Sequence, residues 1–597
     1  MNTELRSNIL SANTVKGVMP SCIVYALVQS MTFMVDTIVA GHFLGTDAVA
    51  AIALGMPIIG LMLSFVGMIL QGGFLKLLVS MGRNDMDDYH RIFSLTLSFT
   101  FLVDFVFLAI CLFGTNGVLG VAGAAKASAE AVAMGQLYIQ TACWMILFFS
   151  LGSLFQIVMA TYGYQTDRML CSIICVVVNV VTSMIFINLL PEEYRIAGLG
   201  IGSALATLAQ TVTAWLMMHR RGIRTRFRLY PPSKQNLVDS LDMLRRGMPS
   251  SVDNMLDSVS GSMVNRIILS TFADGTGVLA LVSIVKSLWS IVRTVGRGSF
   301  YAGEPLIGIL HGERDNEGIK QTFLTTLKVG LIYAVGLGAV LLALKNPLLS
   351  FYHVGDNPDA HVGVIMLAFG GLLAVVSFTF NAVYEATGRL SLSLLVAVVP
   401  DSILYPLMIP ILSRPFGVTG VWLALSFNFI PFFIVFYLVF LILNRGKFPV
   451  PLENLLVLKQ YKGRTLDLDV SISTEAKDIT FVSERLQSFF LEQGAPSKVA
   501  YTTALCTEEI AADYLEHRTN EGRDGKTAYM DIKAFRDAGQ IEIILRNYDE
   551  PYNPLSFERK EVDVSKIGIT MVQKIAKNIT YGYSYHLNVV TIIIADR

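Results

Sequence analysis

The sequence has little of what a soluble enzyme or a secreted scaffold needs. Only 15% of its 597 residues are charged, and 46 basic residues balance 46 acidic ones. A net charge of zero gives no support for nucleic acid or a polyacidic molecule as a partner. The six cysteines form no CxxC pair, so neither a zinc site nor a disulfide framework is indicated. We expect these cysteines to be small apolar residues within helices.

Two further signatures are absent. The sequence contains no Walker-type GxxxxGK[ST] loop, which argues against transport driven directly by ATP. The polar N-terminal stretch leads straight into a long apolar span, without the short apolar region and small-residue cleavage site of a secretory signal. We therefore expect no cleaved signal peptide.

Charge is distributed unevenly along the chain. From Thr465 to the C-terminus, 36 of 133 residues are Asp, Glu, Lys or Arg, whereas the first 464 residues contain only 56. The apolar content of 53% excludes both intrinsic disorder and a purely soluble protein. The sequence thus predicts a membrane region joined to a soluble domain at 465–597 by a proline-containing linker at 450–464.

Apolar stretches in the membrane region reach the length of about 20 residues that a helix needs to cross a bilayer. Short polar breaks separate them, so we expect twelve transmembrane helices. Their expected ranges are 18–41, 50–79, 92–114, 131–161, 169–190, 197–218, 249–272, 278–307, 323–345, 361–387, 391–413 and 418–443.

Basic residues favour one side of this predicted topology. An even number of spans puts both termini on the same side. With the termini inside, the inside segments hold eighteen lysines and arginines and the outside loops hold four. Cytoplasmic loops are enriched in these residues. We therefore expect a multi-pass protein of the bacterial inner membrane, in contact with its lipids and with both termini in the cytoplasm.

Two parts of the sequence repeat each other with an offset near 230 residues. The motif KGVMPS at 16–21 returns as RRGMPS at 245–250, and GRND at 82–85 returns as GERD at 312–315. Such a repeat indicates a duplication of six spans, and because six is even both copies insert in the same orientation. We expect an all-α membrane fold of two six-helix lobes facing across a cleft, at 1–230 and 231–449.

Polar residues inside the spans are candidate ligands, because a carboxylate in the hydrocarbon layer is costly unless it faces water, a partner or an ion. Asp36 interrupts the first span. Asp253 and Asp257 stand one helical turn apart in the seventh, where their repulsion should hold a proton or recruit a cation. Structural roles stay open, such as helix bridging for Asn179 or simple solvation for Asp253. The candidate ion or substrate ligands are Asp36, Asn179, Asp253, Asp257 and Asn265, and the unassigned charges are Asp104, Lys286, Arg293, Arg297, Glu304, Glu385 and Asp401.

With these features in view, the first 445 residues resemble multidrug and toxic compound extrusion (MATE) transporters. The stretches MVDTIVAGHFLGTDAVAAIALGMPI, SMGRND and IAGLGIGSALATLAQ carry the resemblance. It implies alternating access and the export of organic, often cationic, molecules driven by inward sodium or proton flow. It also assigns Asp36, Asn179 and Asp257 to family positions in spans one, five and seven. Sodium-coupled members have a further acid in the tenth span, and here none precedes Glu385.

The soluble domain alternates strands and helices, which predicts an α+β two-layer sandwich with helices on one face of a sheet. This order resembles the ATP-binding fold of histidine kinases, Hsp90-like proteins and, most closely, anti-sigma-factor serine kinases. The expected strands are 467–473, 527–535, 541–547, 579–585 and 589–595, and the expected helices are 478–493, 497–517 and 568–578.

The nucleotide-binding signatures implied by this second resemblance are degenerate. Asp513 replaces the usual asparagine and could still ligate magnesium. Asn547 replaces the adenine-binding aspartate, and Gly568 alone remains of the Gly-rich lid. ATP and magnesium are thus expected only as ligands of a degenerate site, and the alternative is a pseudo-ATPase that binds a cytoplasmic regulatory protein. The candidate nucleotide ligands are Glu509, Asp513, His517, Asn547, Asp549, Asn553 and Gly568.

These observations favour an exporter of organic cations, coupled to protons or sodium ions, with a cytoplasmic regulatory domain. Whether the soluble domain is also an enzyme is left open. A second hypothesis is a membrane sensor that signals through the soluble domain. A third keeps the transporter and changes the cargo to lipid-linked or peptide-like molecules.

Overall fold

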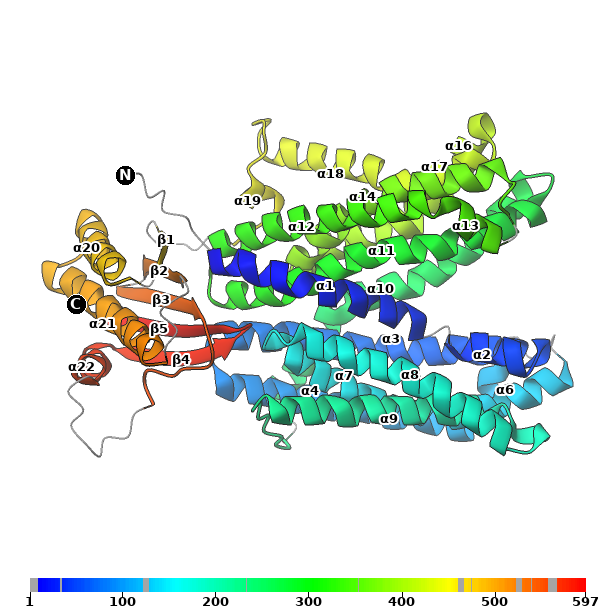
Figure 1. Ribbon diagram of the computed structural model, residues 1–597, viewed down its shortest axis with the longest axis horizontal. Coiled ribbons are helices and arrows are strands. Elements are labelled where there is room, and N and C mark those ends of the chain that lie inside the picture. Colours follow the sequence, from blue (N-terminus) through cyan, green and yellow to red (C-terminus); the bar gives the residue numbers. More distant parts are fainter. Residues whose placement is uncertain are drawn as a thin grey trace.

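A long helical region carries a small sheet domain at one end (Figure 1). This computed structural model describes residues 9–32, 35–121, 128–231, 233–352, 354–459, 467–473, 475–521, 529–537, 539–556 and 566–596.

The N-terminal lobe consists of helices that cover the first six expected spans. Two of these spans are helix pairs, with bends of 43° between α1 and α2 and 42° between α6 and α7. The elements are α1 (Ile9–Thr32), α2 (Val35–Phe43), α3 (Thr46–Gly82), α4 (Met86–Phe113), α5 (Thr115–Val121), α6 (Ala129–Ala142), α7 (Met145–Thr161), α8 (Gln165–Leu189), the short η2 (Glu192–Tyr194) and α9 (Ala197–Arg220).

The C-terminal lobe covers the other six expected spans. Its last span is a pair, α17 and α18, bent by 41°. The elements are α10 (Lys234–Thr271), α11 (Gly275–Gly312), α12 (Asn316–Ala343), α13 (Lys345–Phe351), α14 (Pro358–Ala386), α15 (Leu390–Val398), the π-helical η3 (Val399–Leu404), α16 (Tyr405–Phe416), α17 (Val418–Phe427) and α18 (Phe429–Leu443).

Length and composition support most of the twelve expected spans. Among the described residues, eight helices are long and apolar enough to cross a bilayer, and the three bent pairs raise the number to eleven. The remaining expected span, 249–272, lies in α10, which is helical but falls outside this set. Its helix begins fifteen residues earlier than expected, at Lys234.

The duplicated turns after α3 and α11 have the same backbone. Asn84 and Arg314 both take left-handed conformations, with φ of 55° and 59°. Asp85 then accepts a bond from the Asp88 amide at 2.9 Å, and Asp315 accepts one from the Gly318 amide, also at 2.9 Å. Both aspartates cap the following helix, so the sequence repeat is also a structural repeat.

The two lobes touch at the end that carries the sheet. A Cβ added at Gly72 of α3 would lie 1.8 Å from the Met243 carbonyl oxygen of α10, and one at Gly247 would lie 1.9 Å from the Met68 carbonyl oxygen. Only glycine permits backbones to approach so closely. At this end the lobes are therefore closed against each other.

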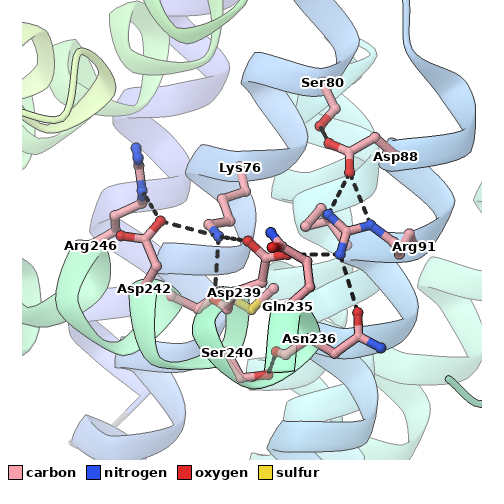
Figure 2. Close-up of polar contacts among 12 residues, drawn as sticks. Lys76, Ser80, Asp88, Arg91, Gln235, Asn236, Asp239, Ser240, Asp242 and Arg246 are labelled. Carbon is pink, nitrogen blue, oxygen red and sulfur yellow. Dashed lines mark hydrogen bonds and ion pairs between the residues drawn. The ribbon is translucent and has the colours of Figure 1, made fainter. Parts of the chain in front are cut away.

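An ion-pair network strengthens this closure (Figure 2). Lys76 of α3 bonds Asp239 of α10 at 2.8 Å, and Arg91 of α4 bonds the same carboxylate at 2.7 Å. Burial opposes ionisation of Asp239, but the bonds from these two cations outweigh it and lower its pKa. Figure 2 also shows Asp242 joined to Lys76 and to Arg246.

The C-terminal domain is a five-stranded antiparallel sheet with strand order β1-β2-β3-β5-β4. Its helices lie on the face away from the lobes (Figure 1) and share an apolar core with alternate strand residues. All eight expected elements occur here. They are β1 (Leu468–Ser473), α20 (Ala476–Glu492), α21 (Ser497–Asn520), β2 (Tyr529–Asp537), β3 (Gln540–Tyr548), α22 (Ile567–Ile575), β4 (Asn578–Ser584) and β5 (Leu587–Ala595).

The first part of the expected linker packs on the C-terminal lobe. It includes the short helix α19 (Leu452–Leu455), whose last carbonyl accepts a bond from the Tyr384 hydroxyl at 2.6 Å. Leu456 is fully buried. Because of these contacts, the part of the linker that includes α19 is an extension of the lobe. The stretch 460–464 of the expected linker lies outside the described residues.

Candidate functional site

Asp36 lies near the start of α2, where its buried carboxylate collects three hydrogen bonds from other helices. The Tyr138 hydroxyl of α6 donates to Oδ2 at 2.8 Å, and the Asn179 amide of α8 donates to Oδ1 at 3.1 Å. The Ser203 hydroxyl of α9 approaches both oxygens, at 3.1 and 2.9 Å. The sequence indicated Asp36 and Asn179 as candidate ligands in different spans, and the structure brings them together.

The carboxylate borders a cavity within the N-terminal lobe. Amide and hydroxyl groups line its polar side, among them Gln29, Thr207 and Gln210, and methionine and aromatic side chains line the rest. A pocket that is mainly apolar with a few convergent polar groups is typical of a small-molecule site.

No lysine, arginine or histidine among the described residues forms an ion pair with Asp36. All three hydrogen-bond donors to its carboxylate are neutral. A carboxylate buried in a membrane region without a cationic partner requires a proton or a bound cation. The site therefore has the chemistry of an ion acceptor next to a ligand cavity.

The seventh-span candidates lie on α10 in the other lobe. Asp253 is half-buried, and Asn265 is exposed. Neither is among the residues that line the cavity at Asp36. The side chains of Asn254 and Asp257 lie outside the described residues, so the expected pairing of Asp253 with Asp257 stays a prediction.

Two groups in the N-terminal lobe escaped the sequence reasoning. Tyr138 and Ser203 carry no charge and sit in ordinary helical patterns, so nothing in their spacing points to Asp36. Ser203 did fall within the IAGLGIGSALATLAQ stretch, which was the available signal.

Asp401 of the C-terminal lobe, which the sequence left unassigned, forms an ion pair with Arg293 at 2.9 Å and accepts a hydrogen bond from Asn428 at 3.0 Å.

The soluble domain brings several nucleotide candidates to one place but fills it from within. Asp513 forms an ion pair with Lys566 and accepts a bond from the Tyr552 hydroxyl at 2.8 Å. The His517 ring stacks on Tyr552 with ring centres 3.7 Å apart. Burial disfavours the Lys566 cation, but its bonds to Asp513 and Tyr552 raise its pKa.

The other candidates in this domain also have local roles. Asp549 pairs with Arg518 at 2.8 Å, and Asn553 accepts from the Leu555 amide at 2.9 Å. A Cβ at Gly568 would lie 1.8 Å from Glu509 Oε2. Since an ammonium group already neutralises Asp513, this arrangement does not fit magnesium.

Asn547 is the exception in this group. It is buried on the helix face of β3, and neither polar atom of its side chain has a hydrogen-bond partner among the described residues. An amide with a free donor and a free acceptor matches the donor and acceptor edge of adenine.

Comparison with known proteins decides the family. The MatE family model matches residues 20–185 and 249–407, which together make up more than half of the chain. The chain belongs to the MatE family. Both matched segments lie in the helical lobes, and neither reaches the sheet domain.

Known relatives agree with this membership. The MatE chain is 24% identical over 334 residues to "Probable multidrug resistance protein YoeA" of Bacillus subtilis (strain 168), covering 53% of this chain and 67% of that protein. Its fold is similar to the "Outward-facing conformation of a multidrug resistance MATE family transporter of the MOP superfamily", with a TM-score of 0.64 at 16% identity. "Crystal structure of MATE in complex with MaD3S" gives a TM-score of 0.64 at 17% identity. Each covers 72% of this chain and 95% of the solved one.

The sheet domain contacts the C-terminal MatE lobe through buried charges. Lys533 of β2 donates a hydrogen bond to Asp315 at 2.6 Å, and Arg546 of β3 forms ion pairs with Asp315, at 2.8 Å, and with Glu313. Lys533 and Arg546 point away from the domain's own helices, and all four side chains are at most 4% exposed. Burial opposes the charge on Asp315, but the two cations outweigh it and lower its pKa.

The tip of the β4–β5 hairpin reaches both MatE lobes. Tyr585 is fully buried and donates to the Ala302 carbonyl of α11 at 3.0 Å. The His586 ring nitrogen lies 3.2 Å from the Gly163 carbonyl oxygen, between α7 and α8. Both tip residues have positive φ, of 53° and 62°, as a two-residue hairpin turn requires. The domain therefore bridges the two lobes at their closed end.

Proposed function

We propose that this protein exports small organic, often cationic, molecules across the bacterial inner membrane in exchange for inward-moving protons or sodium ions. Asp36 carries the proposal, because it is a buried acid with only neutral donors around it, at the edge of a cavity. Binding of a proton or sodium ion would change the charge that a cationic substrate meets in this cavity. Competition for one carboxylate is the simplest form of antiport.

Efflux of a fluorescent organic cation from vesicles that contain the purified full-length chain tests this function. Proton and sodium gradients are imposed separately, so the coupling ion is identified in the same experiment. Asp36→Asn should reduce gradient-driven efflux to the background of empty vesicles. Asp104→Asn, which changes a buried acid that accepts a bond from Ser150 at 3.0 Å elsewhere in the lobe, should retain it. Equal efflux from wild type and Asp36→Asn would refute the proposal.

The C-terminal domain is proposed to lie in the cytoplasm and to regulate the lobes. Its contacts support this role, because the β4–β5 tip touches α11 of one lobe and the α7–α8 turn of the other. Alternating access requires the lobes to separate at each end in turn, so a domain bound to both stabilises the closed end. A chain ending at Lys459, which keeps α19, should therefore open this end more readily and transport at a different rate. Identical rates for the truncated and full-length chains would contradict regulation.

A nucleotide is the proposed effector of this domain, in keeping with its resemblance to ATP-binding folds. Asn547 supports recognition of a purine base, and the Lys566–Asp513 pair argues for binding without magnesium. Calorimetry on the full-length protein with ATP, in the presence and absence of magnesium, tests this. The expected heat is independent of magnesium and lost in Asn547→Leu. Absence of any heat at millimolar ATP would favour a protein partner as the effector.

A further inference from the structure

Two glutamates from the C-terminal lobe meet at one amide of the N-terminal lobe. Glu304 of α11 and Glu385 of α14 both accept hydrogen bonds from the Gln71 Nε2 of α3, at 2.6 and 3.0 Å. Glu304 is 1% exposed and Glu385 is fully buried. The three residues lie within expected spans and far apart in the sequence, so this group exists only where the lobes touch.

The remaining polar contacts of these glutamates are few. The Ser250 hydroxyl of α10 donates to Glu385 Oε1 at 2.6 Å. The second oxygen of Glu385, Oε2, is buried and has no hydrogen-bond partner among the residues described. Ser393 lies near Glu385 and favours its charged form, and its hydroxyl donates to Asn381 at 2.7 Å. Apart from this shared hydroxyl, one carboxylate oxygen of Glu385 has no hydrogen-bond donor among the residues described.

Two charged groups act on the pair from neighbouring helices. The positive charge of Arg168 on α8 attracts Glu304. Its guanidinium, however, donates to the Tyr25 hydroxyl at 2.9 Å and lies 4.1 Å from the centre of the Tyr25 ring. Asp253 of α10 adds a negative charge on the side of Glu385. In the described part of the chain, neither glutamate forms an ion pair with a basic residue.

The state in which both glutamates are ionised has a high free energy. Two ionised carboxylates that share one amide in a low-dielectric region repel each other strongly, and binding one proton removes this cost. A proton on Glu385 Oε2 would also leave Oε1 free to accept its two bonds. The group that bridges the two carboxylates is the N–H donor of Gln71, which a cation cannot take as a ligand, so the proton is the better fit.

We propose that Glu304 and Glu385 form a proton-binding site at the junction of the lobes. It holds a proton while the lobes are closed at the sheet-bearing end and exchanges it when they separate. Separation withdraws Gln71 together with α3, and water then reaches both carboxylates. The proposal rests on the proposed function for the movement of the lobes. It adds a proton site whose carboxylates belong to the other lobe from the cavity at Asp36.

Infrared difference spectroscopy of the purified full-length protein tests the site without transport. A titration from acidic to alkaline pH should show the carbonyl band of a protonated, buried carboxylic acid. The part of this band that comes from the pair should disappear in the variant that combines Glu304→Gln and Glu385→Gln, which keeps the size of both side chains, and protonated Asp36 and Asp531 account for any remainder. Asp104→Asn removes a buried acid from another helix and should leave the band in place. A band unchanged in the double variant overturns the proposal, as does the absence of such a band in the wild type.

Efflux measured against pH then tests the coupling. We expect the efflux rate of the double variant to change with pH about fivefold less, or less still, than that of the wild type. Fivefold is the lower end of the coupling between linked sites. The same pH dependence in wild type and double variant would contradict a role in transport. A wild type that shows the infrared band but no efflux would instead contradict the proposed function and leave the proton site standing.

Discussion

Buried charge is treated in opposite ways in two regions of the molecule. Around Asp36 the protein supplies three neutral donors and no cation among the described residues. At the interface with the sheet domain, Asp315 and Glu313 are enclosed by Lys533 and Arg546. The first arrangement leaves the compensating charge to a mobile ion. The second supplies it within the chain, which suits a contact that holds parts together.

The largest effect is expected when a cation is removed from the buried ion pairs at the interface with the sheet domain. Arg546→Ala leaves two buried carboxylates short of a cation, and removal of one partner from a buried ion pair costs about 3–5 kcal/mol. We expect the sheet domain to detach from the lobes, measured as faster proteolysis after residue 459 and a lower unfolding temperature. Arg536→Ala, which breaks a partly exposed pair with Asp596 within the sheet domain, is the control and should have a smaller effect. Equal stability of Arg546→Ala and wild type would show that the pairs are not needed for docking.

A second test concerns a carboxyl group at the same interface that lacks full compensation. Burial raises the pKa of Asp531 to about 7, despite a bond from Ser471 and the nearby Arg546. An acid with a raised folded-state pKa binds more protons folded than unfolded, so its contribution to stability falls as pH rises from about 4 to about 7. Asp531→Asn should remove this loss and stabilise docking by on the order of 2 kcal/mol at neutral pH. Thermal unfolding across this pH range measures it, and parallel profiles for both proteins would contradict the pKa shift.

Substitutions in the ion-pair network of Figure 2 should destabilise the molecule less than Arg546→Ala does, because the charges of this network are partly exposed. Lys76→Met removes one of the two cations on Asp239, and we expect a cost of about 1–2 kcal/mol at the closed end. Cross-linking of cysteines placed across α3 and α10 measures the population of the closed end. Arg221→Met, which removes a half-exposed arginine from its pair with the buried Asp167 within one lobe, is the matched control and should leave cross-linking unchanged.

The smallest effect is expected at Asp36, the carboxylate with only neutral donors. Ser203→Ala removes one of the donors to the Asp36 carboxylate, worth about 1 kcal/mol to its charged form. The proton should then bind more tightly, by roughly fivefold. The pH at which gradient-driven efflux is half-maximal reports this change and should rise by under one unit. A shift to lower pH would show that Ser203 does not stabilise the anion.

Much of the architecture was predictable because it depends on local patterns. Every expected span corresponds to one described helix or to consecutive described helices, apart from residues 33 and 34, which lie outside the described residues, and every expected strand and helix of the soluble region occurs. The bends inside spans were missed, as was the extension of α10 to Lys234, since hydropathy measures average composition and not the path of a helix axis. The assignment of the C-terminal sheet to an ATP-binding fold stays a proposal.

The sites were harder to predict than the fold. Asp36 and Asn179 could be named as candidates, but nothing in the spacing of Tyr138 and Ser203 pointed to Asp36. Lys566 was missed for a similar reason, because a lysine 53 positions after Asp513 in the sequence is only one of many candidates for its partner. A charged residue in an apolar span can be recognised from the sequence as a candidate, but the sequence does not show which residues contact it.

The sequence by itself determined the membrane region, its duplication, the soluble domain and the rare charges within the spans. Those features follow from hydropathy and periodicity, which act over neighbouring residues. Only the tertiary structure decided which charges are compensated. Glu304 and Glu385 meet at Gln71, and Asp315 meets Lys533, across more than 200 residues in several cases. Electrostatic energy depends on distance in space and on exclusion of water, and neither quantity is contained in the order of residues.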